Sequence, residues 1–149
     1  MKNKHVAEEA IVTGDFGEAA VALALSKKGI MVLRSQTIGI DLLAIDNSKA
    51  VFPTDRLIGI SVKTRLTESP SLNVEKDIKK LKRIAREWKF DPWFAFLDAE
   101  NLYIFPINET KNKEVLTNSG AISFSKLNNK TDVLHFKWKK FEYKRSKKI

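Results

Sequence analysis

Three charged residues interrupt segments of the chain that are otherwise apolar. Glu18 has apolar neighbours three, four and seven positions later, which is the spacing of one helix face. Asp41 lies in the apolar run 39–45, and Lys63 is the only charge in the run 57–63. A charge in an apolar setting is destabilising unless a partner satisfies it. Asp41 and Lys63 have opposite charges in two successive strand-like runs, so each offers the other a partner.

The types of these residues suit hydrolysis of a phosphodiester bond. Alternation along a strand puts Ser61 and Lys63 on one face, and Asp41 joins them if the two strands pair. Asp41 would then hold Mg²⁺, which polarises a phosphate and lowers the pKa of bound water. Lys63 would stabilise charge on the phosphorane or orient the attacking water, and Glu18 would orient that water or share a second ion. The alternative is structural, with an Asp41–Lys63 ion pair and Glu18 at the border of its helix face.

The apolar patterns predict an α/β domain with a mixed sheet flanked by helices, in the order helix, three strands, helix, two strands. The predicted segments are a helix over 7–28, strands over 30–34, 38–45 and 57–64, a helix over 74–88, and strands over 93–97 and 102–107. A break of the first helix near 13–15 is left open. Beyond 108 the pattern is weaker and indicates a short helix, a strand near 121–124 and a strand over 136–139. We expect one domain over 1–149.

The composition indicates a globular protein with a polyanion as its partner. The chain has 149 residues, of which 43% are hydrophobic and 30% charged, with two histidines and no cysteine. Any metal would therefore be a hard cation held by oxygens. The net charge of +9 is concentrated in 74–89, with seven Lys/Arg against three acids, and in a basic tail over about 137–149, with seven against one. Such segments favour nucleic acid, although a solvated helix face and a solubility tail would look the same.

The sequence also favours an intracellular, cytoplasmic protein. The first residues lack the apolar segment of a secretory signal. No apolar run approaches the roughly 20 residues that a membrane span needs. We therefore expect no membrane contact.

Three short motifs resemble those of the PD-(D/E)XK nuclease superfamily. They are Gly17-Glu18, Gly39-Ile40-Asp41-Leu42-Leu43 and Ile60-Ser61-Val62-Lys63-Thr64. The layout is most similar to the branch that contains the archaeal Holliday junction resolvases. In that branch a leading helix carries a glutamate, one strand carries G-x-D, the next ends in E-x-K, and a basic helix follows. The resemblance covers roughly 14–107, and it depends on order and spacing because each motif is short.

The resemblance implies a restriction endonuclease-like fold and a Mg²⁺-dependent DNA endonuclease, with Mn²⁺ as a substitute metal. It further implies a substrate of duplex or branched DNA and a homodimer. One residue departs from the pattern, since Ser61 stands where the family has the glutamate of E-x-K. Some restriction endonucleases with S-x-K recruit a glutamate from the following helix. Glu75, twelve residues after Lys63, is the main candidate here, and Glu68 is a weaker one.

The predicted site therefore comprises three sets of residues. They are the catalytic residues Glu18, Asp41, Ser61, Lys63 and Glu75, the metal ligands Glu18, Asp41, Val62 and Glu75, and the DNA contacts Thr64, Arg65, Lys79, Lys80, Lys82, Arg83 and Arg86. Two alternatives are left open. One is a DNA-binding module of the same fold with a disabled site, which the loss of the glutamate at position 61 would explain. The other is a basic structural subunit of a larger complex.

Overall fold

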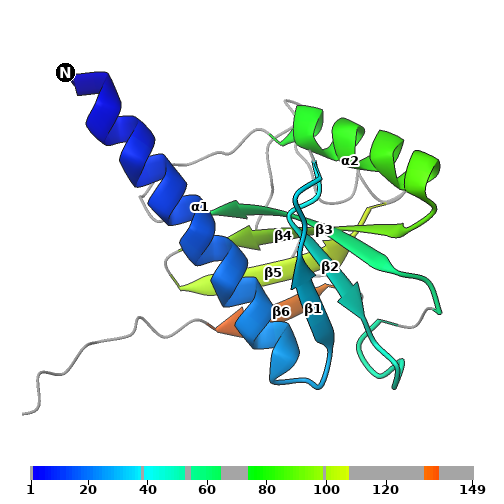
Figure 1. The fold of residues 1–149 in the computed structure, drawn as a ribbon. Helices are drawn as coiled ribbons and strands as arrows, with labels where there is room; N and C mark the ends of the chain where they lie inside the picture. Colours follow the sequence, from blue (N-terminus) through cyan, green and yellow to red (C-terminus); the bar gives the residue numbers. More distant parts are fainter. Residues whose placement is uncertain are drawn as a thin grey trace, which may run out of the picture.

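A computed structural model describes residues 2–37, 39–52, 55–64, 74–98, 100–107 and 133–137, with side chains from Gly14 onward. These residues form two helices and six strands (Figure 1). The elements are α1 (Lys2–Ser26), β1 (Met31–Arg34), β2 (Leu42–Ile45), β3 (Ile58–Thr64), α2 (Glu75–Trp88), β4 (Asp91–Leu97), β5 (Asn101–Pro106) and β6 (Leu134–Lys137).

The six strands form one mixed sheet in the order β1-β2-β3-β4-β5-β6. All neighbouring strands are antiparallel except β3 and β4, which are parallel. A parallel pair needs a crossover connection, and α2 lies in the connection between these two strands. The predicted order of helix, three strands, helix and two strands is confirmed, and so is the mixed α/β class.

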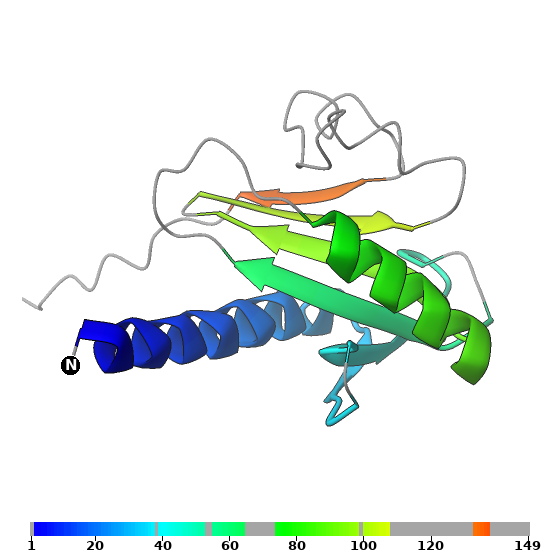
Figure 2. The same cartoon turned by 90° about the horizontal axis from the view of Figure 1, so that it is seen from above.

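The sheet lies between the two helices, so each helix encloses a separate part of the core (Figure 2). On the α1 side, Val21 and Leu25 pack with Leu42 and Ile60. On the α2 side, the buried residues are Ile78, Leu81, Ile84, Phe94 and Phe105, among others. Burial of each such side chain stabilises the fold by about 1.5–3 kcal/mol.

A residue with a left-handed backbone follows each helix. Gly29 has φ of 80° three residues after the end of α1, and Lys89 has φ of 55° directly after α2. This conformation commonly ends a helix because it directs the last amides back to open carbonyls. Here the N–H of Gly29 donates to the carbonyl of Ser26 at 3.0 Å. The break near 13–15 does not occur, and α1 is continuous from Lys2 to Ser26.

The end of the chain is described only in part. The strand predicted over 136–139 corresponds to β6, which begins earlier, at Leu134. The short helix after 108, the strand near 121–124 and most of the basic tail lie outside the described residues. Within the part of the chain that is described, no helix has the length and apolar character needed to span a membrane.

Candidate active site

Asp41 lies immediately before β2, not within a strand as predicted, and the backbone of β3 holds it in place. Its N–H donates to the carbonyl of Ile60 at 2.9 Å, and its carbonyl accepts from the N–H of Ser35 at 3.0 Å. Its carboxylate oxygen Oδ2 accepts a hydrogen bond from the backbone N–H of Val62 at 2.7 Å. Val62, predicted as a metal ligand, thus fixes the orientation of the Asp41 carboxylate.

Gly39 allows the turn that delivers Asp41 to this position. Its φ of 89° is a conformation that L side chains rarely adopt. A Cβ atom at this position would lie 2.4 Å from Cδ1 of Ile84 in α2. The glycine of the G-x-D motif is therefore needed both for the turn and for the close packing of α2.

Gly17 plays a similar part for Glu18, because it lets α1 approach β3 closely. A Cβ atom on Gly17 would lie 1.7 Å from Oγ1 of Thr64. That hydroxyl is buried, and no residue of the described part gives it a hydrogen bond. Thr64, predicted to contact DNA, thus packs its hydroxyl against α1. The close approach places Glu18, the next residue along the helix, at the margin of the sheet.

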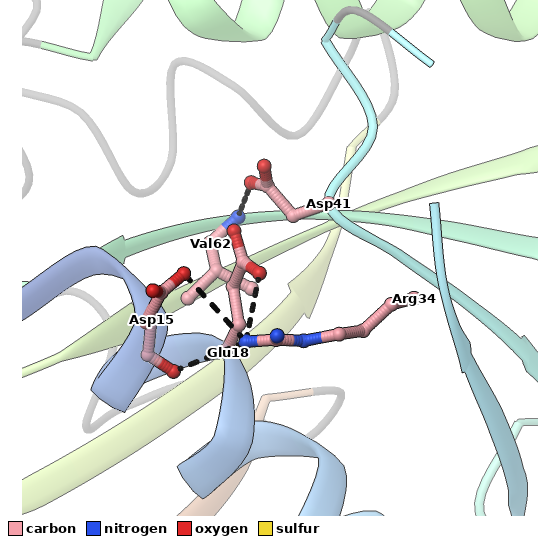
Figure 3. A network of polar contacts seen from close by, with 5 residues as sticks. All are labelled: Asp15, Glu18, Arg34, Asp41 and Val62. Atoms are coloured by element: carbon pink, nitrogen blue, oxygen red, sulfur yellow. Dashed lines mark hydrogen bonds and ion pairs between the residues drawn. The ribbon is translucent and has the colours of Figure 1, made fainter. Parts of the chain in front are cut away.

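The carboxyl groups of Glu18 and Asp41 meet at this margin (Figure 3). Burial raises the pKa of Glu18, and the negative charge of Asp41 raises it further. The guanidinium of Arg34 lowers this pKa, while Asp15 and a hydrogen bond with Asp41 raise it. The pKa of Glu18 is raised overall, because burial and the neighbouring carboxylates outweigh the effect of Arg34. The structure therefore brings together two of the three residues from which the site was predicted.

Arg34, at the end of β1, is part of this cluster and was not predicted. Its Nη2 atom lies 3.4 Å from Oε2 of Glu18 and 3.7 Å from Oδ1 of Asp15. The same atom donates to the backbone carbonyl of Asp15 at 3.5 Å. A signal was present in the sequence, since Arg34 is the first charge after the apolar run 30–33.

Lys63 and Ser61 lie on the face of the sheet that α2 covers. β2 and β3 pair as predicted, with Leu42 opposite Ile60. Ser61 is buried, and Lys63 stands two positions further along β3. The Nζ atom of Lys63 lies 3.3 Å from Oδ1 of Asp77 in α2. Among the described residues, Lys63 thus forms its ion pair with Asp77. The structural alternative, which predicted an ion pair between Asp41 and Lys63, is wrong.

Glu75, predicted to replace the missing glutamate, does not join Glu18 and Asp41. Its Oε1 atom lies 3.3 Å from Nζ of Lys79 one turn along α2, on the exposed side. The described part of the chain contains no group of three or more His, Asp or Glu side chains placed to hold a metal. Glu68 and Arg65 lie outside the described residues.

The remaining predicted DNA contacts lie along α2. One of them, Lys82, is half-buried. The other four are exposed, namely Lys79, Lys80, Arg83 and Arg86. The opposite side of the helix is buried in the core. These cations follow a first turn that carries the acids Glu75 and Asp77, and Asp77 contacts Lys63.

The donor set of Glu18 and Asp41 fits a hard divalent cation. Mg²⁺ is usually held by one or two carboxylates and keeps several waters. Two carboxyl groups in contact, one with a raised pKa, form a site where added positive charge is favourable. The backbone N–H of Val62 occupies one oxygen of Asp41. A cation would replace the repulsion between the two carboxylates with attraction.

Comparisons with known proteins support the fold. No protein-family model and no curated protein matches the chain. The structure is similar to that of Hjc from Archaeoglobus fulgidus, a Holliday junction resolvase from an archaeal hyperthermophile. The TM-score is 0.55 at 19% sequence identity, over 77% of this chain and 92% of that chain. The predicted restriction endonuclease-like fold is thereby confirmed.

Proposed function

We propose that the chain is a metal-dependent DNA endonuclease that hydrolyses phosphodiester bonds. The observation that carries this proposal is the contact between the Glu18 and Asp41 carboxyl groups, together with the raised pKa of Glu18. An acid with a perturbed pKa that faces a second acid is characteristic of sites that bind a cation or perform acid–base chemistry. The similarity to a resolvase structure supports the same reading.

Each residue of the site has a role in this proposal. When bound between Glu18 and Asp41, Mg²⁺ or Mn²⁺ would supply Lewis-acid polarisation of the scissile phosphate. Asp41 is oriented by the Val62 N–H, and Glu18 is held by Arg34. Lys63, one residue after Val62, would stabilise the charge that builds up on the phosphate oxygens during attack.

The basic side of α2 would hold the backbone of the DNA. Its cations Lys79, Lys80, Arg83 and Arg86 contact phosphates in this proposal, which positions the duplex without reading its sequence. We propose branched DNA as the preferred substrate and a homodimer as the active form. The similarity to a Holliday junction resolvase supports the branched substrate, and the resemblance of the sequence motifs to the resolvase branch is the ground for proposing a homodimer.

A cleavage assay tests this function directly. The protein is incubated with a labelled four-way junction and with linear duplex of the same sequence, in Mg²⁺, in Mn²⁺ and in EDTA. We expect cleavage that requires the metal, is faster on the junction and is lost in Asp41→Ala. Absence of cleavage with either metal, or equal cleavage by Asp41→Ala, would contradict the proposal.

A second candidate function is DNA binding without cleavage. Ser61 occupies the position of a family carboxylate, and the described residues supply a pair of acids, not a group of three. This candidate predicts tight binding and no product. The affinity would fall steeply with salt, because bound cations on the DNA are released. Measurement of the dissociation constant against salt concentration, beside the cleavage assay, separates the two functions.

A further inference from the structure

Asp77 is an acid in an unexpected place. It lies in the first turn of α2, within the segment 74–89 that carries seven cations and three acids. A carboxylate beside the proposed phosphate contacts opposes DNA binding, because it repels the backbone. Its Oδ1 atom lies 3.3 Å from Nζ of Lys63, and each side chain is a little over one-third exposed.

The stability of the fold does not explain the pair. An ion pair that is exposed to this degree contributes little, because water screens it and two flexible side chains lose freedom. The negative charge is also favourable near a helix N-terminus, but Glu75 supplies this in the same turn. The Asp77 carboxylate opposes DNA binding, and its ion pair with Lys63 stabilises the fold only slightly. Another role is therefore needed to explain it.

The backbone under Asp77 is well fixed. The next residue, Ile78, is 1% exposed and packs in the core on this face of the sheet. Lys63 stands on β3 opposite Phe96 of β4, a member of the same core. A rigid helix thus holds the end of a long, flexible lysine side chain, which would otherwise sample many rotamers.

We propose that Asp77 is a positioning residue for Lys63 and holds its ammonium group ready for the scissile phosphate. This proposal rests on the proposed endonuclease function. The arrangement joins the helix that would bind the DNA backbone to the lysine that would act in the reaction. Misplacement of a reacting group by a small distance costs about 10- to 100-fold in rate. The predicted signature is therefore a loss of rate without a loss of DNA affinity.

The test compares Asp77→Asn with Glu87→Gln, which removes the same charge from the exposed side of α2, near its other end. Single-turnover cleavage and the DNA dissociation constant are measured for both. We expect Asp77→Asn to cleave about 10- to 100-fold more slowly, with DNA binding unchanged or tighter. Glu87→Gln should cleave at the wild-type rate, and Asp77→Glu should recover part of it. Equal melting temperatures of the variants exclude a folding defect.

A second measurement does not depend on catalysis. The rate at which an acylating reagent modifies Lys63 is followed by peptide mass spectrometry, with Lys79 as an internal reference. Modification should be faster in Asp77→Asn, because the ion pair shields the amine in the wild type. An unchanged rate of modification would show that the contact does not hold in solution and would overturn the inference.

The outcomes separate this inference from the function on which it rests. If the wild type cleaves and Asp77→Asn cleaves equally fast, the positioning role is wrong and the endonuclease proposal stands. If the wild type cleaves no DNA with either metal, the endonuclease proposal fails and the positioning role fails with it. If Asp77→Asn loses rate and affinity together, Asp77 supports the structure of α2, which also contradicts positioning.

Discussion

Two aspartates at the two ends of β2 differ in what satisfies their charge. Asp46 follows the strand and is buried, and its carboxylate accepts four hydrogen bonds. The donors are the N–H and hydroxyl of Ser48 at 3.2 and 2.7 Å, the N–H of Val51 at 2.8 Å and that of Phe52 at 3.0 Å. Hydrogen bonds led by that of Phe52 lower the pKa of Asp46 to about 2.

Asp41 precedes the strand and faces a second acid. It accepts one hydrogen bond from a backbone N–H, and the Glu18 carboxyl group lies against it with its pKa raised. A carboxylate whose lone pairs are filled by its own loop stabilises the fold and has no need of a ligand. Two carboxylates that face one another, with Arg34 paired to Glu18, still carry an excess of negative charge. The groups that surround a carboxylate thus distinguish a structural residue from a candidate metal ligand.

The sharpest test of this difference is to make the same substitution at both positions. Asp41→Asn should lower cleavage roughly 10³-fold or more, because it removes a ligand and a negative charge at the reacting phosphate. Asp46→Asn should cleave at the wild-type rate below its melting temperature. Single-turnover assays measure both. A comparable loss in the two variants would indicate that Asp41 acts through the fold.

A glycine substitution tests whether the approach of α1 to β3 positions Glu18. Gly17→Ala should reduce the free energy of unfolding by about 1–3 kcal/mol, because the new methyl group meets the Thr64 side chain. It should also slow cleavage by displacing Glu18. Gly14→Ala on the same helix is the control, because nothing lies within 4 Å of its Cβ position. Urea unfolding that gives equal losses for both variants would contradict the close contact.

Removal of the Asp46 charge should destabilise the fold in a pH-dependent way. At neutral pH, Asp46→Asn should lose about 1–2 kcal/mol, because hydrogen bonds to a charged acceptor become bonds to a neutral one. The folded pKa of about 2 lies below the ordinary 3.8. The charge therefore stabilises the protein fully above the ordinary value, and this contribution is lost as the pH falls through the folded one. Urea unfolding of wild type and variant across this range should converge at low pH.

The smallest expected effect is that of Glu18→Gln, which should raise the stability of the fold whereas Asp46→Asn lowers it. Because the pKa of Glu18 is raised in the folded state, its ionisation destabilises the fold as the pH rises above the ordinary value of 4.5. Without divalent metal, Glu18→Gln should therefore stabilise the protein at neutral pH, by about 0.5 kcal/mol after the loss of the Arg34 pair. Thermal unfolding in EDTA measures this. A clear loss of stability would show that Glu18 is satisfied in the fold.

Much of the fold and part of the site could be predicted from the sequence. The apolar periodicity gave the order of the elements and the bounds of α2 closely. Asp41 and Lys63 were recognisable because a single charge in an apolar run needs a partner. The motif glycines were also found, although their contacts with Thr64 and Ile84 are tertiary and have no local pattern.

The parts of the site that could not be predicted depend on contacts between segments that lie far apart in the sequence. Arg34 meets Glu18 only because β1 lies at the edge of the sheet beside α1. The choice of Glu75 as the acid facing β3 was made from spacing along the chain, whereas the helix turns Asp77 toward Lys63. A difference of two positions reverses which side of a helix faces the sheet. The start of α2 relative to β3 cannot be fixed to that precision from spacing.

The most direct test of the central claim is Mn²⁺ binding followed by electron paramagnetic resonance, which needs neither DNA nor catalysis. The wild type should bind Mn²⁺, and the affinity should fall by about tenfold or more in both Glu18→Gln and Asp41→Asn. Asp46→Asn should bind as the wild type does. Equal binding by the wild type, Glu18→Gln and Asp41→Asn, or no binding by the wild type, would contradict the assignment of these two carboxylates as a metal site.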